Sequence, residues 1–174
     1  IGEQSVHAQK LDWKRFTTDQ FRKWYRIEIE PLKRITPDVP CTTNLMGTYP
    51  GINYFDLAKD LDFVCWDSYP QWESTENDIA TAQFFSFEHD LTRGLKGGKP
   101  FFLMESCPSA TNWRPYARLH RPGVHELQSM QAVGHGADSV QYFQFRKSRG
   151  SSEKFHGAVV DHCGHEHTRV FAEI

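Results

Sequence analysis

Glu105 is the residue whose type and setting in this chain are best suited to chemistry. An apolar stretch, Pro-Phe-Phe-Leu-Met at 100–104, leads directly to it, and a polar loop opens immediately afterwards. A carboxylate at the end of a buried strand is held rigidly and yet faces any ligand that binds at that edge of a sheet. The ends of the other predicted strands bring further polar side chains to the same face: Asn44, Asp67, Tyr69, Arg146, Glu153 and His156.

Carboxylates gathered at one face, without a phosphate-binding loop or a metal-ligand spacing, point to glycoside hydrolysis. That reaction needs two carboxyl groups that flank the scissile bond. In a retaining enzyme one of them is an ionised nucleophile, so it requires polar neighbours. Glu105 suits this role, and Arg146, Tyr69 or Asn44 could donate hydrogen bonds to it. The alternative is a structural carboxylate that caps backbone amides of the following loop.

Other residues have both a functional and a structural interpretation. Asp67 could be a second acid, although a turn in which its carboxylate accepts from backbone amides is favoured. Glu153 and His156 lie three residues apart and could bind sugar hydroxyls, or they could belong to a solvated loop. Trp113 lies in a polar loop, as a sugar platform or as a loop anchor. Trp72 is a weaker candidate for such a platform.

Hydrophobic periodicity and turn residues predict the elements that position these groups. The helix over 17–35 is expected to begin at a capping box of Thr17 and Gln20. Its apolar row is expected to pack in the core: Phe21, Trp24, Tyr25, Ile29, Leu32 and Ile35. A helix over 123–134 is expected to turn Val124, Leu127, Met130 and Val133 inward. The remaining elements are helices over 54–61 and 77–96 and strands over 39–46, 62–67, 100–105 and 139–145.

Strands and helices therefore alternate four times, which predicts a parallel sheet with crossover helices. The loops that follow the strands are long and polar, as at the catalytic face of a (β/α)8 TIM barrel. A complete barrel takes about 250 residues, and this chain has 174. We therefore expect only the second half of a barrel, about strands 5–8. A doubly wound open sheet would require a glycine-rich phosphate loop, and none follows the first strand.

Composition excludes several classes of protein. The formal net charge is -2, which gives no broad field for nucleic acid or an anionic membrane. No apolar run is long enough for a membrane-spanning helix. The four cysteines form no CxxC pair, so no metal site is expected, and reduced thiols suggest a cytoplasmic protein. The histidine-rich stretch 162–167 matches no standard metal spacing and is interpreted as a surface loop. Because the chain does not begin with Met, it does not report on a signal peptide.

Several stretches, in order and spanning nearly the whole chain, resemble the glycoside hydrolase family 42 β-galactosidases. The resemblance rests on these segments: Leu-Asp-Trp-Lys-Arg-Phe at 11–16, Thr-Thr-Asn-Leu-Met-Gly at 42–47, Asp-Phe-Val-Cys-Trp-Asp-Ser-Tyr-Pro at 62–70, Leu-Met-Glu-Ser at 103–106 with Thr-Asn-Trp-Arg-Pro at 111–115, His-Gly-Ala-Asp-Ser-Val at 135–140 and Glu-Lys-Phe-His-Gly at 153–157.

The resemblance implies a retaining enzyme that releases terminal β-D-galactose from β-galactosides such as lactose, without a cofactor. By match to the family's Met-Glu-Ser motif, Glu105 would be the nucleophile. Trp113 would line the galactose subsite, and Glu153 and His156 would bind galactose hydroxyls. Tyr69 and Phe143 would line the pocket.

One departure from the family pattern has a large consequence. The family's acid/base residue follows an Asn at the end of the fourth barrel strand, and no Asn-Glu pair precedes the predicted helix 17–35. The family's zinc cluster and its trimer-forming domain also have no counterpart here. Residues 1–174 are therefore expected to be the C-terminal half of a catalytic barrel, inactive alone, which needs the N-terminal half and forms a trimer. The alternatives are a non-catalytic galactoside-binding or scaffold fragment, and a relative that acts on another β-glycoside.

Overall fold

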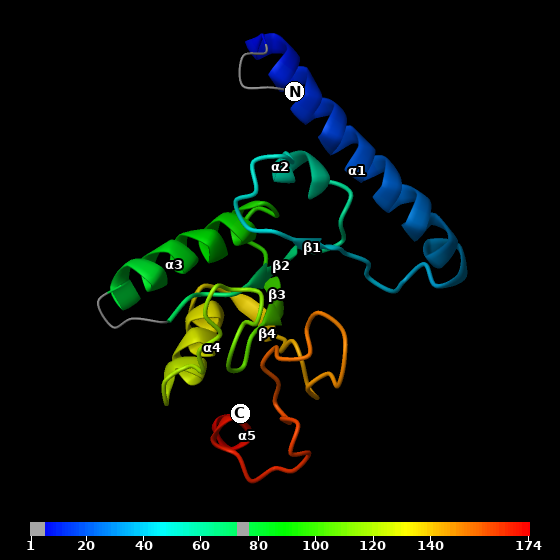
Figure 1. Ribbon diagram of the computed structural model, residues 1–174. Coiled ribbons are helices and arrows are strands. Elements are labelled where there is room, and N and C mark those ends of the chain that lie inside the picture. Colours follow the sequence, from blue (N-terminus) through cyan, green and yellow to red (C-terminus); the bar gives the residue numbers. More distant parts are fainter. Residues whose placement is uncertain (1–5, 73–76) are drawn as a thin grey trace.

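The structure is a computed structural model that describes residues 6–72 and 77–174, and in it strands alternate with helices (Figure 1). The strands form one sheet in the order β1-β2-β3-β4, and each neighbouring pair is parallel. This arrangement confirms the predicted parallel sheet with crossover helices. The elements are α1 (His7–Ile35), β1 (Asn44–Leu45), α2 (Tyr54–Leu57), β2 (Cys65–Ser68), α3 (Asp78–Gly94), β3 (Phe101–Ser106), α4 (Val124–Gly134), β4 (Ala137–Val140) and α5 (Arg169–Glu173).

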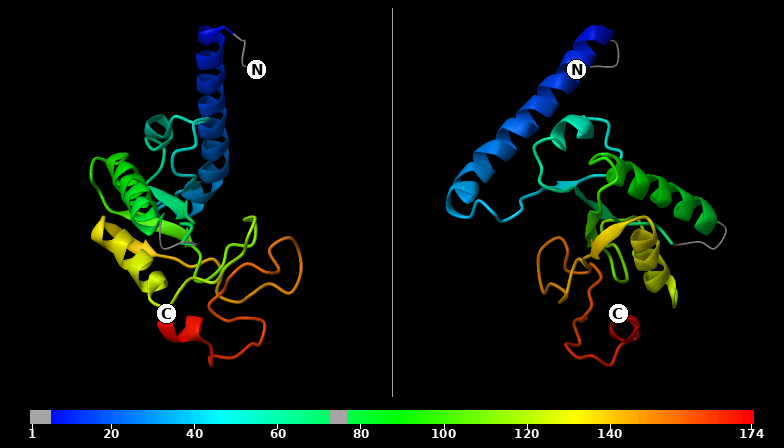
Figure 2. Two further views of the ribbon diagram at one scale, coloured as in Figure 1. Left: turned by 60° about the vertical axis from the view of Figure 1, so that its left-hand side comes forward. Right: turned by 180° about the vertical axis from the view of Figure 1, so that it is seen from behind.

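The two faces of the sheet have different surroundings. Helices α3 and α4 lie along one side of it (Figure 2). On that side, the Trp66 ring of β2 packs against Phe85 and His89 of α3, with ring centroids 6.1 and 5.1 Å apart. Successive side chains of a strand point to opposite faces. Cys65 and Asp67 therefore face away from α3, toward the side that would be the interior of a barrel.

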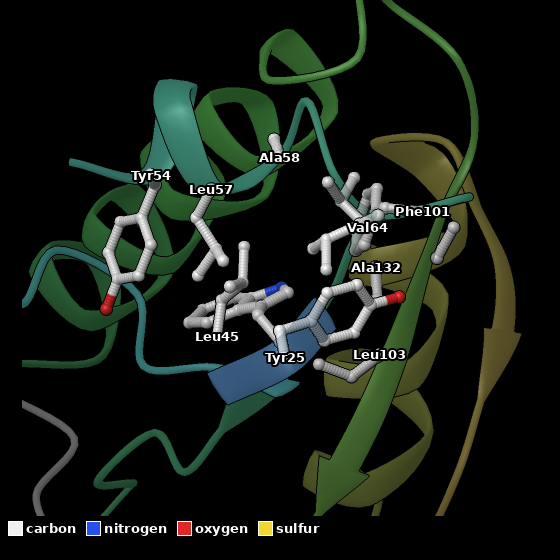
Figure 3. Close-up of a cluster of buried hydrophobic side chains, with 12 residues drawn as sticks. Tyr25, Leu45, Tyr54, Leu57, Ala58, Val64, Phe101, Leu103 and Ala132 are labelled. Carbon is white, nitrogen blue, oxygen red and sulfur yellow. The ribbon is translucent and has the colours of Figure 1, made fainter. Parts of the chain in front are cut away.

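A core of buried side chains joins the sheet to its helices (Figure 3). Tyr25 of α1 and Leu57 of α2 pack with Val64 and with Leu103 of β3, and each of these side chains is at most 7% exposed. Tyr25 also donates a hydrogen bond from its hydroxyl to the carbonyl oxygen of Cys41, at 3.0 Å. Burial of such side chains stabilises the fold by about 1.5–3 kcal/mol each.

The pairing of β2 with β3 contains an irregularity that decides which residues meet at the strand ends. Trp66 pairs with Leu103, but the next residue, Asp67, pairs with Glu105. Met104 is thus the extra residue on β3, as in a bulge. The shift places Asp67 directly beside Glu105 on neighbouring strands, which lie about 4.8 Å apart in a sheet.

The start of α1 differs from the prediction. The helix begins at His7, so Thr17 lies in its interior and not at a cap. The Thr17 hydroxyl donates to the carbonyl oxygen of Trp13, four residues earlier, at 2.9 Å. A threonine can satisfy its hydroxyl in this way inside a helix. The predicted capping box is therefore wrong. Although α1 has 29 residues, no helix of the described chain has the length and apolar character needed to cross a membrane.

The apolar row of α1 is only partly in the core. Tyr25 is buried and Ile29 packs against the core cluster. The prediction that the whole row is buried is wrong, because the helix contacts the described chain along one narrow face, mainly at α2. Four members of the row are 47% to 76% exposed: Phe21, Trp24, Leu32 and Ile35.

The inward face of α4 also differs from the prediction. Val124 is buried as expected, but the predicted partners Leu127, Met130 and Val133 are 58%, 59% and 48% exposed. Helical periodicity reports that a face is apolar and does not report which neighbour covers it. The face that packs on the sheet carries His125, Gln128 and Ala132. Strand β1 is shorter than the predicted strand over 39–46, and β4 begins earlier than the predicted strand over 139–145.

His89 of α3 is a titratable group inside the apolar core. Its side chain is 2% exposed, and its ring centroid lies 5.5 Å from that of Phe101. Burial, with a further contribution from His135, lowers the pKa of His89 from 6.5 to about 4. The neutral imidazole therefore contributes stability that is fully present above pH 6.5 and is lost as the pH falls through about 4.

Replacement of His89 by Leu should make the free energy of unfolding less dependent on pH between pH 7 and pH 4. A pKa difference of this size corresponds to about 2–3 kcal/mol between pH 7 and pH 4. On going from pH 7 to pH 4, the free energy of unfolding of the variant should therefore decrease by about 2–3 kcal/mol less than that of wild type. Denaturant titrations followed by tryptophan fluorescence measure both decreases. The exposed His167→Leu variant is the matched control and should follow wild type. Parallel curves for wild type and His89→Leu would contradict the assignment.

Candidate functional site

Glu105 lies at the carboxyl end of β3, where the apolar strand meets the loops. Its side chain is half-buried, while the next residue, Ser106, is fully buried on the opposite face. Because Met104 is the extra residue of the bulge, Glu105 points to the side away from α4, opposite to Ser106, and its carboxylate stays accessible. This is the position that the sequence predicts for a residue that is both rigidly held and open to a ligand.

Two hydrogen-bond donors from neighbouring segments hold the Glu105 carboxylate. The Tyr69 hydroxyl donates to Oε2 at 2.5 Å. Asn44 donates from Nδ2 to Oε1 over a longer distance, 3.4 Å. Each oxygen therefore has its own donor, which fixes the plane of the carboxylate. The third predicted donor, Arg146, is not at this position; its backbone forms a bridge with Val160 near the chain's C-terminal region.

Tyr69 is a donor that keeps its proton. Burial, followed by its hydrogen bond to the Glu105 carboxylate, raises the pKa of the Tyr69 phenol far above its usual value. The hydroxyl therefore remains protonated at any physiological pH and can only donate to an ionised Glu105. This short, charge-assisted hydrogen bond is the strongest polar contact that the described residues make with Glu105.

Asp67 is the second carboxylate of the site. Asn44 Nδ2 lies 3.2 and 3.0 Å from its two oxygens, so the same amide contacts both Asp67 and Glu105. Burial raises the pKa of Asp67 to about 6; the Asn44 hydrogen bond opposes this shift and the Glu105 charge adds to it. The prediction that the Asp67 carboxylate caps a turn is wrong, because Asp67 lies within β2 and its carboxylate accepts from Asn44.

Aromatic rings surround the Tyr69–Glu105 pair. The Tyr69 ring makes an edge contact with Trp113, whose side chain is 52% exposed, with centroids 5.5 Å apart. The Arg114 guanidinium lies 4.3 Å over the Trp113 ring. On another side, the His156 ring lies 5.7 Å from Tyr69 and 5.0 Å from Phe143. The predicted residues Tyr69, Trp113, His156 and Phe143 therefore form one contiguous group, which Tyr69 joins to Glu105.

His156 is fully buried and has one unused nitrogen. Its Nδ1 lies 3.1 Å from the carbonyl oxygen of Gly157, so that nitrogen carries the proton and donates. Its Nε2 has no hydrogen-bond partner among the described residues. Glu153 is linked to His156 through the backbone: the His156 amide donates to the Glu153 carbonyl oxygen at 3.0 Å. Glu153 itself is half-buried, and no contact joins its carboxylate to the Tyr69–Glu105 pair.

A buried polar network supports the site from the helix side. Gln128 of α4 donates from Nε2 to Ser106 Oγ at 2.5 Å and accepts from the Trp72 indole N–H at 2.9 Å. All three side chains are at most 4% exposed. Trp72 is therefore a structural residue, and its interpretation as a sugar platform is wrong. The sequence offered one overlooked signal, a polar residue at a helix position flanked by the buried Val124 and Ala132.

The stretch 162–167 forms an exposed loop. Cys163 Sγ lies 3.9 Å from His165 Nδ1. Across the described parts of the chain, no three His, Cys, Asp or Glu side chains come together in a way that could hold a metal ion. All four cysteines are unpaired in the structure.

Comparison with known proteins gives one consistent family. A family model described as beta-galactosidase matches residues 1–174. A β-galactosidase of Alicyclobacillus acidocaldarius is 58% identical over 99% of this chain and 25% of its own length. One from Clostridium perfringens is 55% identical over 99% of this chain and 26% of its own. The chain thus spans about a quarter of the length of these curated relatives.

Solved structures agree with the sequence comparison. The crystal structure of a cold-adapted β-galactosidase from Rahnella sp. R3 superposes with a TM-score of 0.95 at 57% identity, covering 99% of this chain and 25% of that one. A family 42 β-galactosidase from G. stearothermophilus gives 0.93 at 48% identity, over 99% and 26% of the two chains. The four parallel strands with their helices are therefore part of a TIM barrel, as the sequence predicts.

Replacement of Gln128 by Leu should destabilise the protein by about 2–4 kcal/mol, because it leaves two buried polar groups, the Ser106 hydroxyl and the Trp72 N–H, without partners. Denaturant-induced unfolding measures the change. The exposed Gln141→Leu variant is the matched control and should change stability by less than about 0.5 kcal/mol. If the two variants lose equal stability, the network does not support the end of β3.

Proposed function

The chain belongs to the glycoside hydrolase family 42 β-galactosidases, and on that premise we propose that it carries the nucleophile half of a retaining enzyme that releases terminal β-D-galactose from lactose-like β-galactosides. The observation that carries this proposal is the Glu105 carboxylate itself. It lies at the carboxyl end of a barrel strand and is held by the protonated Tyr69 hydroxyl at 2.5 Å. A carboxylate so fixed is suited to attack and not to proton donation.

The proposed reaction has two displacements at the same carbon. An oxygen of Glu105 attacks the anomeric carbon of galactose, and the bond from that carbon to the leaving oxygen breaks. A general acid outside this chain gives its proton to the leaving oxygen. Water then attacks the anomeric carbon, the ester bond to Glu105 breaks, and the proton of the water passes to the same acid/base group. Two inversions retain the β configuration.

Tyr69 has a distinct role at each stage. While Glu105 is ionised, the Tyr69 hydroxyl holds one carboxylate oxygen and leaves the other on the weaker Asn44 contact. When Glu105 becomes an ester, its negative charge is lost and the hydrogen bond weakens. In the second displacement the leaving carboxylate regains its charge, and the same hydroxyl stabilises it.

The surrounding side chains would bind the sugar. Trp113 offers a half-exposed ring beside Tyr69, suited to stack on the C–H face of galactose. The unpartnered Nε2 of His156 is an acceptor for a sugar hydroxyl, and Phe143 packs on the same ring. Glu153 would accept from a second hydroxyl, which requires its carboxylate to turn toward the site when sugar binds.

The chain as given would be the C-terminal half of the catalytic barrel, with residues 1–174 as one partial domain. The exposed apolar face of α1, which includes Trp13, Phe16 and Trp24, supports this proposal. A soluble monomer rarely exposes such a face without a partner. The preceding barrel units would cover it and would supply the acid/base residue. General acid catalysis contributes about 10²–10⁴-fold, so the isolated segment should be nearly inactive.

A mechanism-based label tests the assignment of the nucleophile. Treatment of the full-length protein with an activated 2-fluoro-galactoside should give a galactosyl adduct on Glu105, identified by peptide mass spectrometry. The adduct should be lost in Glu105→Gln and kept in the exposed control Glu126→Gln. The isolated segment should take up little or no label. An adduct on any other residue of the active full-length protein would overturn the proposal.

Removal of the Tyr69 hydroxyl should weaken catalysis without loss of the fold. A hydrogen bond to a charged group is worth about 1.5–3 kcal/mol. Because the hydroxyl stabilises the Glu105 carboxylate as it leaves in the second displacement, Tyr69→Phe should lower kcat on nitrophenyl β-D-galactoside about 10- to 100-fold. The control is Tyr116→Phe, since Tyr116 is 69% exposed, and it should match wild type. A normal kcat for Tyr69→Phe would exclude this role.

A further inference from the structure

Asp67 is a charged neighbour of Glu105 to which the proposed mechanism gives no task. The shifted register of β2 and β3 makes the two residues direct partners on adjacent strands. The Asn44 amide of β1 then spans both carboxylates, at 3.0 Å from Asp67 Oδ2 and 3.4 Å from Glu105 Oε1. Three consecutive strands thus contribute one polar side chain each to a single line of contacts.

We propose that Asp67 is a positioning residue for the nucleophile: its carboxylate anchors the Asn44 amide, which orients Glu105, and its negative charge favours the step in which Glu105 becomes an ester. This inference rests on the proposed function of Glu105. The Asn44 amide has two N–H groups. With one held by Asp67, the other is directed at Glu105, so the nucleophile is fixed by Asn44 on one oxygen and by Tyr69 on the other.

The charge of Asp67 acts in the same direction as its hydrogen bond to Asn44. Two ionised carboxylates on adjacent strands repel each other, and the repulsion disappears when Glu105 forms a neutral ester. The transition state of glycoside hydrolysis also carries positive charge at the anomeric carbon. A second carboxylate behind the nucleophile stabilises that charge. Both effects lower the barrier to formation of the galactosyl ester and are absent when Asp67 is protonated.

Apart from Glu105, the groups that face Asp67 are uncharged. Asn44 faces it from β1 and is neutral. Cys65 lies two residues earlier on the same strand, and burial raises the pKa of its thiol to about 11, so it is uncharged. Tyr69, which follows the strand, keeps its proton. Loss of the Asp67 charge on acidification should therefore remove the electrostatic repulsion that Asp67 exerts on Glu105.

The test compares Asp67→Asn with wild type in the full-length protein. The matched control is Asp138→Asn, an exposed aspartate in β4 of the same sheet. Two quantities are measured: the rate of labelling by the 2-fluoro-galactoside at pH 7, and kcat/KM on nitrophenyl β-D-galactoside from pH 4 to pH 8. We expect Asp67→Asn to slow labelling about tenfold and to move the acid limb of kcat/KM down by about one pH unit or more.

A second variant keeps the test decisive if Asp67→Asn folds poorly. Asn44 is exposed, so Asn44→Ala should fold, and it removes the amide that joins the two carboxylates. We expect it to slow labelling by no more than Asp67→Asn does, and the double variant to be little slower than Asp67→Asn alone, since the Asn44 contact is one of the two routes by which Asp67 acts. A purely structural role would lower stability and leave the acid limb in place.

The outcomes separate the inference from the proposed function. If wild type carries no adduct on Glu105, the proposed function itself fails. If wild type is labelled on Glu105, while Asp67→Asn and Asn44→Ala label at the wild-type rate with an unmoved acid limb, the inference alone is overturned. Additive losses in the double variant would also overturn it, because they would mean that Asp67 does not act through Asn44.

Discussion

The parallel pairing of β2 with β3 is the constraint on which the site depends. If the register continued unchanged from Trp66 and Leu103, Asp67 would lie opposite Met104. The extra residue on β3 brings Asp67 opposite Glu105 and Ser68 opposite Ser106 instead. One irregularity thus sets two contacts: a carboxylate pair on the side away from the helices and, on the other side, a serine that α4 can reach.

The two sides of the end of β3 have different surroundings. On the helix side, the Trp72, Gln128 and Ser106 groups are removed from water, so each must satisfy the others, and this fixes the strand end rigidly. On the open side, the Glu105 carboxylate is accessible, and its hydrogen-bond donors among the described residues are Tyr69 and Asn44. The end of β3 is therefore held rigidly from the helix side, and the carboxylate stays accessible on the other side.

The sequence predicted the alternation of elements, the parallel sheet and the position of Glu105 at a strand end, because each follows from local periodicity and turn residues. It also predicted that Tyr69 and Asn44 would neighbour Glu105, because parallel strands bring their carboxyl ends to one edge. It failed where contacts come from distant segments. The bond from Asn44 to Asp67 depends on strand register, which no local pattern encodes. The network of Gln128 depends on helix rotation, for which the sequence offers only the apolar Val124 and Ala132, four residues to either side of Gln128. The exposed rows of α1 and α4 show that an apolar stripe identifies a buried face only when its covering partner is present.

The contact between Trp113 and Arg114 has a stereochemical consequence. The guanidinium lies 4.3 Å over the indole and so occupies one of its two faces. In the proposed function, a pyranose would then stack on the opposite face alone. Together with the proposed attack from the fixed Glu105 carboxylate, this one-sided platform would favour one enantiomer of a sugar. The mirror-image hexose, stacked on the same free face, would present its anomeric carbon and hydroxyls in a different arrangement.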